Sequence, residues 1–206
     1  MNKKKIWFVI LPIILFIMLA VFIKAGLSAN FEAWAYAESV EKMSPIITNV
    51  MKFITHIGDP AIFVSFCLIL FAITKSRKTI ALPVCITVII SVFLNFTLKN
   101  VFSRPRPDIL RLINETDYSF PSGHAMNNAA LYTILIFLTF KYIKSKPLKI
   151  CLSIYFTLIT IAIGYSRVYL GVHYAGDILG GWLLGFAVAI SVYFLWNGKL
   201  SKKENL

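Results

Sequence analysis

The sequence predicts an all-α membrane protein: one bundle of six transmembrane helices, with short interfacial helices after the first. Of its 206 residues, 58% are hydrophobic and only 15% are charged, whereas soluble domains carry about a quarter charged residues. The apolar residues also come in blocks near the roughly 20 residues that a membrane helix needs. Six such helices would use about 120 positions. Little room remains for a soluble domain, so we expect residues 1–206 to form a single domain.

Six apolar blocks are the predicted transmembrane helices. The first follows Lys3, Lys4 and Lys5. It is too long for the apolar part of a signal peptide, and no small-residue cleavage site follows it, so we expect it to be retained as a helix. The second block is the shortest. The blocks cover approximately residues 6–23, 58–74, 79–98, 123–143, 148–165 and 176–196.

The segment 25–57, between the first two blocks, is expected to form amphipathic helices at the membrane surface. It carries Trp34, Tyr36 and charges of both signs, and apolar residues recur at roughly helical spacing between Ile46 and Ile54. Such helices could act as a lid or entrance ramp for lipid, or simply pack against the bundle. Both interpretations remain open.

Basic residues are concentrated on one side of the predicted bundle. Both ends of the chain, the connection around residues 75–78 and the connection around residues 141–149 hold 13 of the 21 Lys and Arg residues, against the single acid Glu204. Cytoplasmic segments of membrane proteins collect Lys and Arg. We therefore expect both termini in the cytoplasm, and the net charge of +12 needs no nucleic-acid partner.

Ionisable residues also border the apolar blocks on the opposite, outer side. Such groups at membrane helix ends are costly unless they are solvated or paired. Lysine and arginine beside two histidines suit a polyanionic ligand, most simply phosphate. The ionisable residues come from three separate connections and are Lys99, Arg106, His124, Arg167, His173 and Asp177. Ser122 and Gly123 stand directly before His124, where backbone N–H groups at a helix N-terminus also bind phosphate.

Each residue also has an ordinary structural interpretation. Lys99 could extend its amine to the interface, and Ser122 before an apolar run is a typical helix N-cap. His173 and Asp177 are four residues apart and could share a structural hydrogen bond on one helix face. His56 lies apart from the others, and we expect it to be structural or interfacial. Jointly, on one membrane face, the remaining residues favour a phosphate site.

Further charged residues flank Arg106 without belonging to the predicted site. Arg104, Asp108 and Arg111 are expected to shape its entrance or to pair with Glu115 and Asp117.

Three motifs resemble the three-part signature of the type 2 phosphatidic acid phosphatase (PAP2) superfamily. They are Lys99-x6-Arg106-Pro107, Pro121-Ser122-Gly123-His124, and Ser166-Arg167-x5-His173-x3-Asp177. Their order and internal spacing match at every signature position. The signature covers residues 99–177, and the six-helix layout extends the likeness over nearly the whole chain.

The resemblance implies a phosphatase that needs no metal ion or other cofactor. His173 would attack phosphorus to form a phosphohistidine, and Asp177 would accept the imidazole N–H. His124 would protonate the leaving oxygen and then activate water. The phosphoryl oxygens would be bound by Lys99, Arg106, Ser122, Gly123 and Arg167.

The implied substrates are lipid phosphates in a bacterial plasma membrane, hydrolysed on the extracytoplasmic side: phosphatidylglycerophosphate, phosphatidate or undecaprenyl diphosphate. Gly123 favours the phosphatidylglycerophosphatases over enzymes dedicated to undecaprenyl diphosphate, which often have Asp there, but the dedicated enzyme stays an alternative. Two other classes of protein also remain possible. An anion or lipid-phosphate transporter would need charges within its helices. A lipid-phosphate binding protein without activity would need neither His124 nor the pair of His173 and Asp177. The oligomeric state is not predicted.

Overall fold

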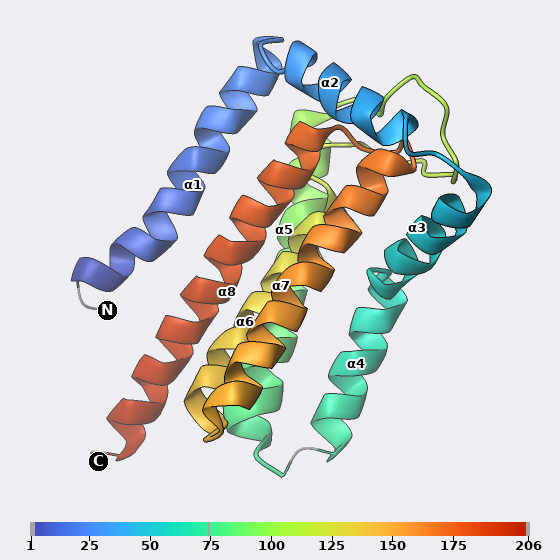
Figure 1. Ribbon diagram of the computed structural model, residues 1–206. Coiled ribbons are helices and arrows are strands. Elements are labelled where there is room, and N and C mark those ends of the chain that lie inside the picture. Colours follow the sequence, from blue (N-terminus) through green and yellow to red (C-terminus); the bar gives the residue numbers. More distant parts are fainter. Residues whose placement is uncertain (1–2, 74, 205–206) are drawn as a thin grey trace.

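The computed structural model describes residues 3–73 and 75–204, with side chains for residues 6–73 and 75–197. Thr74, at the end of the second predicted block, and the side chains of the basic residues near both termini lie outside these ranges. Within them the regular elements are all helical (Figure 1). They are α1 (Lys3–Lys24), α2 (Ala29–Val40), α3 (Pro45–Ile57), α4 (Pro60–Ile73), the π-helix η1 (Arg77–Ala81), α5 (Leu82–Phe102), α6 (Gly123–Tyr142), α7 (Lys146–Tyr169) and α8 (Ala175–Glu204).

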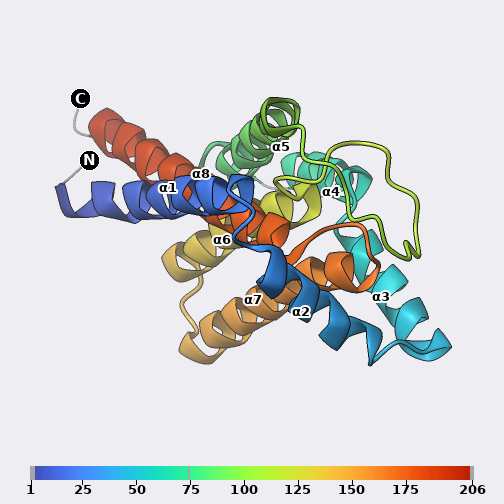
Figure 2. The ribbon, with the colours of Figure 1, turned by 90° about the horizontal axis from the view of Figure 1, so that it is seen from above.

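The long helices run side by side, and α2 lies across one end of the bundle (Figures 1 and 2). The loop 103–122 and the α7–α8 connection are at this same end. Helix α1 begins, and α8 ends, at the opposite end. The connections that carry the basic residues 75–78 and 141–149 therefore lie far from α2, as the charge pattern predicts.

Helix α6 is the centre of the bundle, packed against α5, α7 and α8. Its Ala129, Ala130 and Ile134 are fully buried. Helix α8 approaches it closely because a Cβ atom at Gly185 would lie only 2.4 Å from the carbonyl oxygen of Met126. The glycines of the sixth apolar block thus serve close helix packing within the chain.

Fewer helices meet the length and hydropathy expected of a membrane span than the sequence predicts. In the described ranges four do: Ile6–Lys24, Arg77–Phe102, Lys146–Tyr169 and Ala175–Asn197. A fifth span arises if α3 and α4, bent by 45° relative to each other, count as one. The predicted second helix on its own, α4, has only 14 residues, and α6 carries His124, Asn127 and Asn128 in its first turns. The number six remains a prediction.

Several predicted helix boundaries need correction. Helix α5 continues to Phe102, so Lys99 lies within its last turn and does not end it. His173 precedes the first residue of α8, so it lies in a turn and not on the same helix as Asp177. The predicted N-cap is present, since the Ser122 hydroxyl accepts a hydrogen bond from the Ala125 amide at 3.4 Å. The segment predicted to be interfacial forms α2 and α3.

Candidate active site

A pocket of about 400 Å³ lies at the α2 end of the bundle. It is bordered by the end of α5, the loop 103–122, the start of α6 and the end of α7. Six of the eight predicted site residues line it together: Lys99, Arg106, Gly123, His124, Arg167 and His173. The other two, Ser122 and Asp177, are fully buried and are joined through the Ser122 amide, which donates to the Asp177 carbonyl at 3.1 Å.

His173 is held through both of its ring nitrogens. Nδ1 lies 3.4 Å from Asp177 Oδ2, and Nε2 lies 3.3 Å from a guanidinium nitrogen of Arg106. A hydrogen on Nδ1 that points to the carboxylate leaves a lone pair on Nε2, which is the arrangement a nucleophilic imidazole needs. Burial, together with the positive charges of Arg106 and Arg167, lowers the pKa of His173 well below its ordinary value. The ring is therefore neutral at pH 7.

The turn that presents His173 depends on Gly171. This residue has φ +73°, and a Cβ atom there would lie 2.2 Å from the Leu110 carbonyl oxygen, so only glycine fits without strain. The turn is fastened to the preceding loop by the Leu112 amide, which donates to the Leu170 carbonyl at 3.0 Å. Arg106 donates to the Val172 carbonyl at 2.7 Å, so the same guanidinium that borders the pocket also fixes the backbone next to His173.

His124 has a carboxylate partner that was not predicted from the sequence. Its Nε2 lies 3.0 Å from Asp59 Oδ1, and the other oxygen of Asp59 lies 2.8 Å from Nδ1 of His56. His56 is exposed and reaches the site only through Asp59; its structural or interfacial role stays a prediction. Asp59 lies between α3 and α4 and directly before Pro60, so the sequence signals only a helix start there. Its pairing with a histidine 65 positions away arises from the tertiary fold.

The three cations that line the pocket each have acidic or polar partners. Lys99 Nζ donates to Asp117 Oδ2 at 2.6 Å. Arg106 also forms an ion pair with Asp117, and Arg167 forms one with Glu115. Glu115 and Asp117 therefore pair with the cations of the site itself and not with Arg104 or Arg111, the partners expected from the sequence.

Arg104 instead connects the site to α2. Its guanidinium donates to Asp177 Oδ1 at 2.6 Å and to Glu32 Oε2 at 2.7 Å, and it lies over the Tyr174 ring at 4.1 Å. Burial lowers the Arg104 pKa, but the two carboxylates outweigh it and raise the pKa above its ordinary value. Arg104 thus links α2 to Asp177, the carboxylate partner of His173, and does not pair with Glu115 or Asp117.

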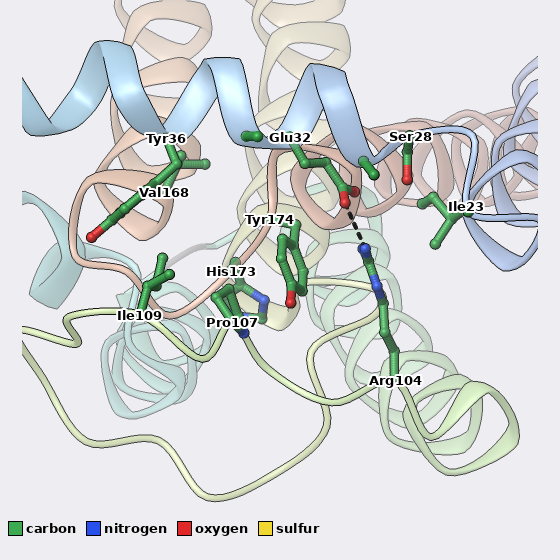
Figure 3. A pocket seen from close by; sticks show the side chains of 13 residues that line it. Ile23, Ser28, Glu32, Tyr36, Arg104, Pro107, Ile109, Val168, His173 and Tyr174 are labelled. Atoms are coloured by element: carbon green, nitrogen blue, oxygen red, sulfur yellow. Dashed lines mark hydrogen bonds and ion pairs between the residues drawn. The ribbon is translucent and has the colours of Figure 1, made fainter.

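A second cavity, of about 460 Å³, reaches His173 from the α2 side. Figure 3 shows its residues, with the ion pair of Glu32 and Arg104 near one end and His173 and Tyr174 in the middle. Ile23, Ile109 and Val168 are among the other residues that line it. His173 is thus bordered by two cavities of different character, one rich in cations and one partly apolar.

Comparisons with known proteins agree with this arrangement. Residues 80–200 match the PAP2 superfamily. The chain is 36% identical over 158 residues to phosphatidylglycerophosphatase B of Bacillus subtilis, an alignment that covers 75% of each protein. It is 26% identical to an undecaprenyl-diphosphatase of Sulfolobus acidocaldarius, over the whole chain and 98% of that protein. The crystal structure of a transmembrane PAP2-type phosphatidylglycerolphosphate phosphatase from Bacillus subtilis superposes with a TM-score of 0.84 at 29% identity, and the match covers 95% of this chain and 97% of that one.

Proposed function

The chain belongs to the PAP2 superfamily, and on that premise we propose that it is an integral-membrane phosphatase that removes the terminal phosphate from lipid phosphate esters. The observation that carries the proposal is the pocket in which Lys99, Arg106 and Arg167 lie with His124 and His173. Cations hold the oxygens of a phosphate group and stabilise the charge that shifts among them during transfer, and the two imidazoles supply a nucleophile and an acid.

In the first step, His173 Nε2 forms a bond to phosphorus while the bond from phosphorus to the lipid oxygen breaks. His124 gives its proton to that oxygen, so the lipid leaves as an alcohol, or as a lipid monophosphate when the substrate is a diphosphate. Asp177 stabilises the positive charge that develops on the His173 ring. Asp59 stabilises the protonated form of His124 before the transfer and thereby acts as a positioning residue.

In the second step, His124 takes a proton from water, and the water oxygen attacks phosphorus. The bond from phosphorus to His173 breaks, and inorganic phosphate is released. Throughout both steps the three cations and the Gly123 amide at the N-terminus of α6 hold the phosphoryl oxygens. Ser122, which was also predicted to bind them, is fully buried and caps α6, so its part is to position that N-terminus. Residues of this chain therefore supply the charge stabilisation, the nucleophile and the group that carries the proton.

The substrate class follows from the position of the pocket. Val92 and Phe96 line it on α5, and both are exposed on the bundle surface, so a lipid tail can remain in the bilayer while its phosphate reaches the cations. We propose phosphatidylglycerophosphate, phosphatidate and undecaprenyl diphosphate as candidates. A panel of assays compares phosphate release from these three lipids. Activity on undecaprenyl diphosphate alone would favour the alternative that the protein is a dedicated undecaprenyl-diphosphate phosphatase.

The test of the proposed function is phosphate release from phosphatidate in detergent with EDTA present. The wild-type protein is expected to be active, because cationic side chains supply the electrostatic stabilisation. His173→Ala removes the nucleophile and should lower kcat to the background rate. Glu38→Ala is the control, since Glu38 is an exposed residue of α2 and does not line the pocket. Near-normal kcat in the His173→Ala protein would show that the nucleophile is misassigned.

We infer that the pocket faces away from the cytoplasm. The connections with residues 75–78 and 141–149 lie at the opposite end of the bundle, and positively charged connections of this kind remain in the cytoplasm. Phosphate would then be released on the extracytoplasmic side of the plasma membrane.

A further inference from the structure

Two carboxylates of the loop 103–122 occupy the cation pocket. Glu115 forms an ion pair with Arg167, and its second oxygen lies 3.6 Å from Arg106. Asp117 forms an ion pair with Arg106 and accepts a hydrogen bond from Lys99 at 2.6 Å. All three cations assigned above to phosphoryl oxygens are therefore bound to carboxylate oxygens of two residues that are close together in the chain.

The cations are fixed parts of the pocket, whereas the carboxylates come from its rim. The side chains of Lys99, Arg106 and Arg167 are 8%, 4% and 1% exposed, against 26% for Glu115 and 55% for Asp117. Burial raises the pKa of Asp117, but hydrogen bonds from Lys99 and Arg106 outweigh it and lower the pKa below its ordinary value. Asp117 is thus ionised at neutral pH and has open solvent into which it can move.

The charges in the pocket match one kind of phosphate group. Glu115 and Asp117 carry −2 against the three cations, while Asp59, the third carboxylate of the lining, pairs with His124 and His56 instead. A phosphate monoester carries about −1.5 to −2 at pH 7, so it can replace both carboxylates with little change in the charge of the pocket. A phosphodiester has one ionisable oxygen and carries only −1, so it cannot balance the cations that both carboxylates neutralise.

We propose that Glu115 and Asp117 are internal competing ligands of the cation pocket and that they select terminal phosphate groups over phosphodiester headgroups. The proposal rests on the proposed function, because it adds a specificity filter to the same site. The phosphate group of the substrate displaces both carboxylates toward solvent. After hydrolysis the two carboxylates compete with inorganic phosphate for the three cations and so favour its release. Phosphodiester lipids, which surround such an enzyme in a bilayer, fail to displace them.

The experiment measures binding of two small probes to the purified protein in detergent: inorganic phosphate and dimethyl phosphate, a diester. Each dissociation constant comes from the ligand-dependent rise of the unfolding temperature, so turnover is not needed. The wild-type protein should bind inorganic phosphate much more tightly than dimethyl phosphate. Equal affinities in the wild-type protein would overturn the proposal without any variant.

Asp117→Asn removes one competing charge and keeps the shape of the side chain. Dimethyl phosphate should then bind about tenfold more tightly, the size expected for one charged hydrogen-bond competitor, and inorganic phosphate should gain less. Glu115→Gln should act in the same direction and provides a second variant should the first unfold. Asp108→Asn is the matched control, since Asp108 is an exposed carboxylate of the same loop and should leave both constants unchanged.

Two outcomes separate this inference from the proposed function. If the Asp117→Asn and Glu115→Gln proteins bind both probes as weakly as the wild type or more weakly, the carboxylates position the cations and do not compete with ligands. That result would overturn the inference even while phosphatidate hydrolysis continues. If the wild-type protein releases no phosphate from any lipid of the panel but Asp117→Asn still tightens diester binding, the proposed function fails and the selective anion site stands.

Discussion

At the scale of single residues, the environment of His173 explains how an imidazole can be both buried and reactive. Asp177 orients one ring nitrogen at 3.4 Å, while the cations of the pocket oppose protonation of the ring. Removal of a positive charge from this pocket would favour the protonated imidazolium, which has no free lone pair and cannot attack phosphorus. The cations that bind phosphate therefore also keep the nucleophile in its neutral form.

This environment sets the expected pH dependence. Protonation of His173 destroys the nucleophile, so kcat/KM falls as the pH falls through the pKa of His173 in the free enzyme. Since burial and nearby cations place this pKa well below the ordinary 6.5, activity should persist on the acid side of pH 6.5. The measurement is a kcat/KM profile on phosphatidate, corrected for titration of the substrate phosphate by phosphorus NMR. A corrected acid limb centred at or above pH 6.5 would contradict the assignment.

Arg104 is a positioning residue whose effect should appear in kcat. It holds Asp177 through a hydrogen bond of 2.6 Å and is itself held by Glu32. Arg104→Gln should lower kcat by about tenfold or more, the range for a lost hydrogen bond between charged groups, with little change in KM, because Arg104 does not line the cation pocket. Arg104→Lys should recover part of the loss.

Arg111→Gln is the matched control for this prediction. Arg111 lies on the same loop, and its Nε donates to the Pro107 carbonyl at 2.9 Å, away from Asp177. An equal loss of kcat in both proteins, or a change in KM alone, would show that Arg104 does not act through Asp177.

The signature residues could be predicted from the sequence because their types and spacing carry chemical meaning before any fold is known. Their partners could not. Asp59 and Glu32 lie 65 and 72 positions from the residues they contact, and nothing local in the sequence connects them. The arrangement of Asp117 was also unpredictable, because an acidic loop residue near several cations has many possible partners until the loop has a conformation.

At the scale of helices, the contact between α6 and α8 sets the distance between the two halves of the site. His124 is in the first turn of α6 and Asp177 in the first turn of α8. Both helices keep small residues at their contact, so their backbones lie close together. A change in this packing therefore moves His124, the proposed acid, relative to Asp177 and the nucleophile His173, even when none of the three is substituted.

Gly185→Ala should therefore destabilise the protein. The added Cβ atom would lie 2.4 Å from the Met126 carbonyl oxygen and 2.7 Å from the Ala129 Cβ atom, so the helices must separate, at a cost of about 1–3 kcal/mol. Thermal unfolding in detergent measures the effect. Ser65→Thr, which also adds one methyl group but at an exposed position of α4, serves as the control. An unfolding temperature that is unchanged by Gly185→Ala would mean that the helices do not meet as closely as described.

The predicted helices correspond closely to observed ones because long apolar blocks leave few other structures available in a membrane. The count of six was less secure for a physical reason. Length and hydropathy identify helices that face lipid, and α6 is surrounded by protein, so it tolerates Asn127 and Asn128 in its first turns. The break between α3 and α4 is signalled locally by Gly58, Asp59 and Pro60, but the bend of 45° depends on tertiary packing, and the sequence does not show whether the two helices form one span.

At the scale of the whole molecule, the ends of the bundle differ in chemistry. The α2 end holds the pocket with its paired charges, and the other end holds unbalanced basic residues such as Lys75, Lys78 and Lys144. This difference predicts the orientation in the membrane, with the pocket outside the cytoplasm.

Labelling in intact bacteria tests the orientation. A cysteine at the exposed Thr116 of the loop 103–122 (Thr116→Cys) should react with a membrane-impermeant maleimide added outside, whereas Lys144→Cys should react only after permeabilisation. Both substitutions are made after Cys67, Cys85 and Cys151 are changed to Ser, and this cysteine-free protein is the control for background labelling. The reverse pattern would place the pocket in the cytoplasm.

The hydrogen bond from the Ser122 amide to the Asp177 carbonyl has a consequence for an enzyme that works in membranes of varying composition. It joins the first turns of two neighbouring helices by backbone atoms alone, at the very end of the bundle. Bilayers that are thicker or thinner than the protein tilt helices or shift them along their axes, yet this junction keeps the two first turns in register. The rate of the chemical step should therefore be indifferent to acyl-chain length in the host bilayer, and adaptation to bilayer thickness should appear in how readily lipids reach the pocket.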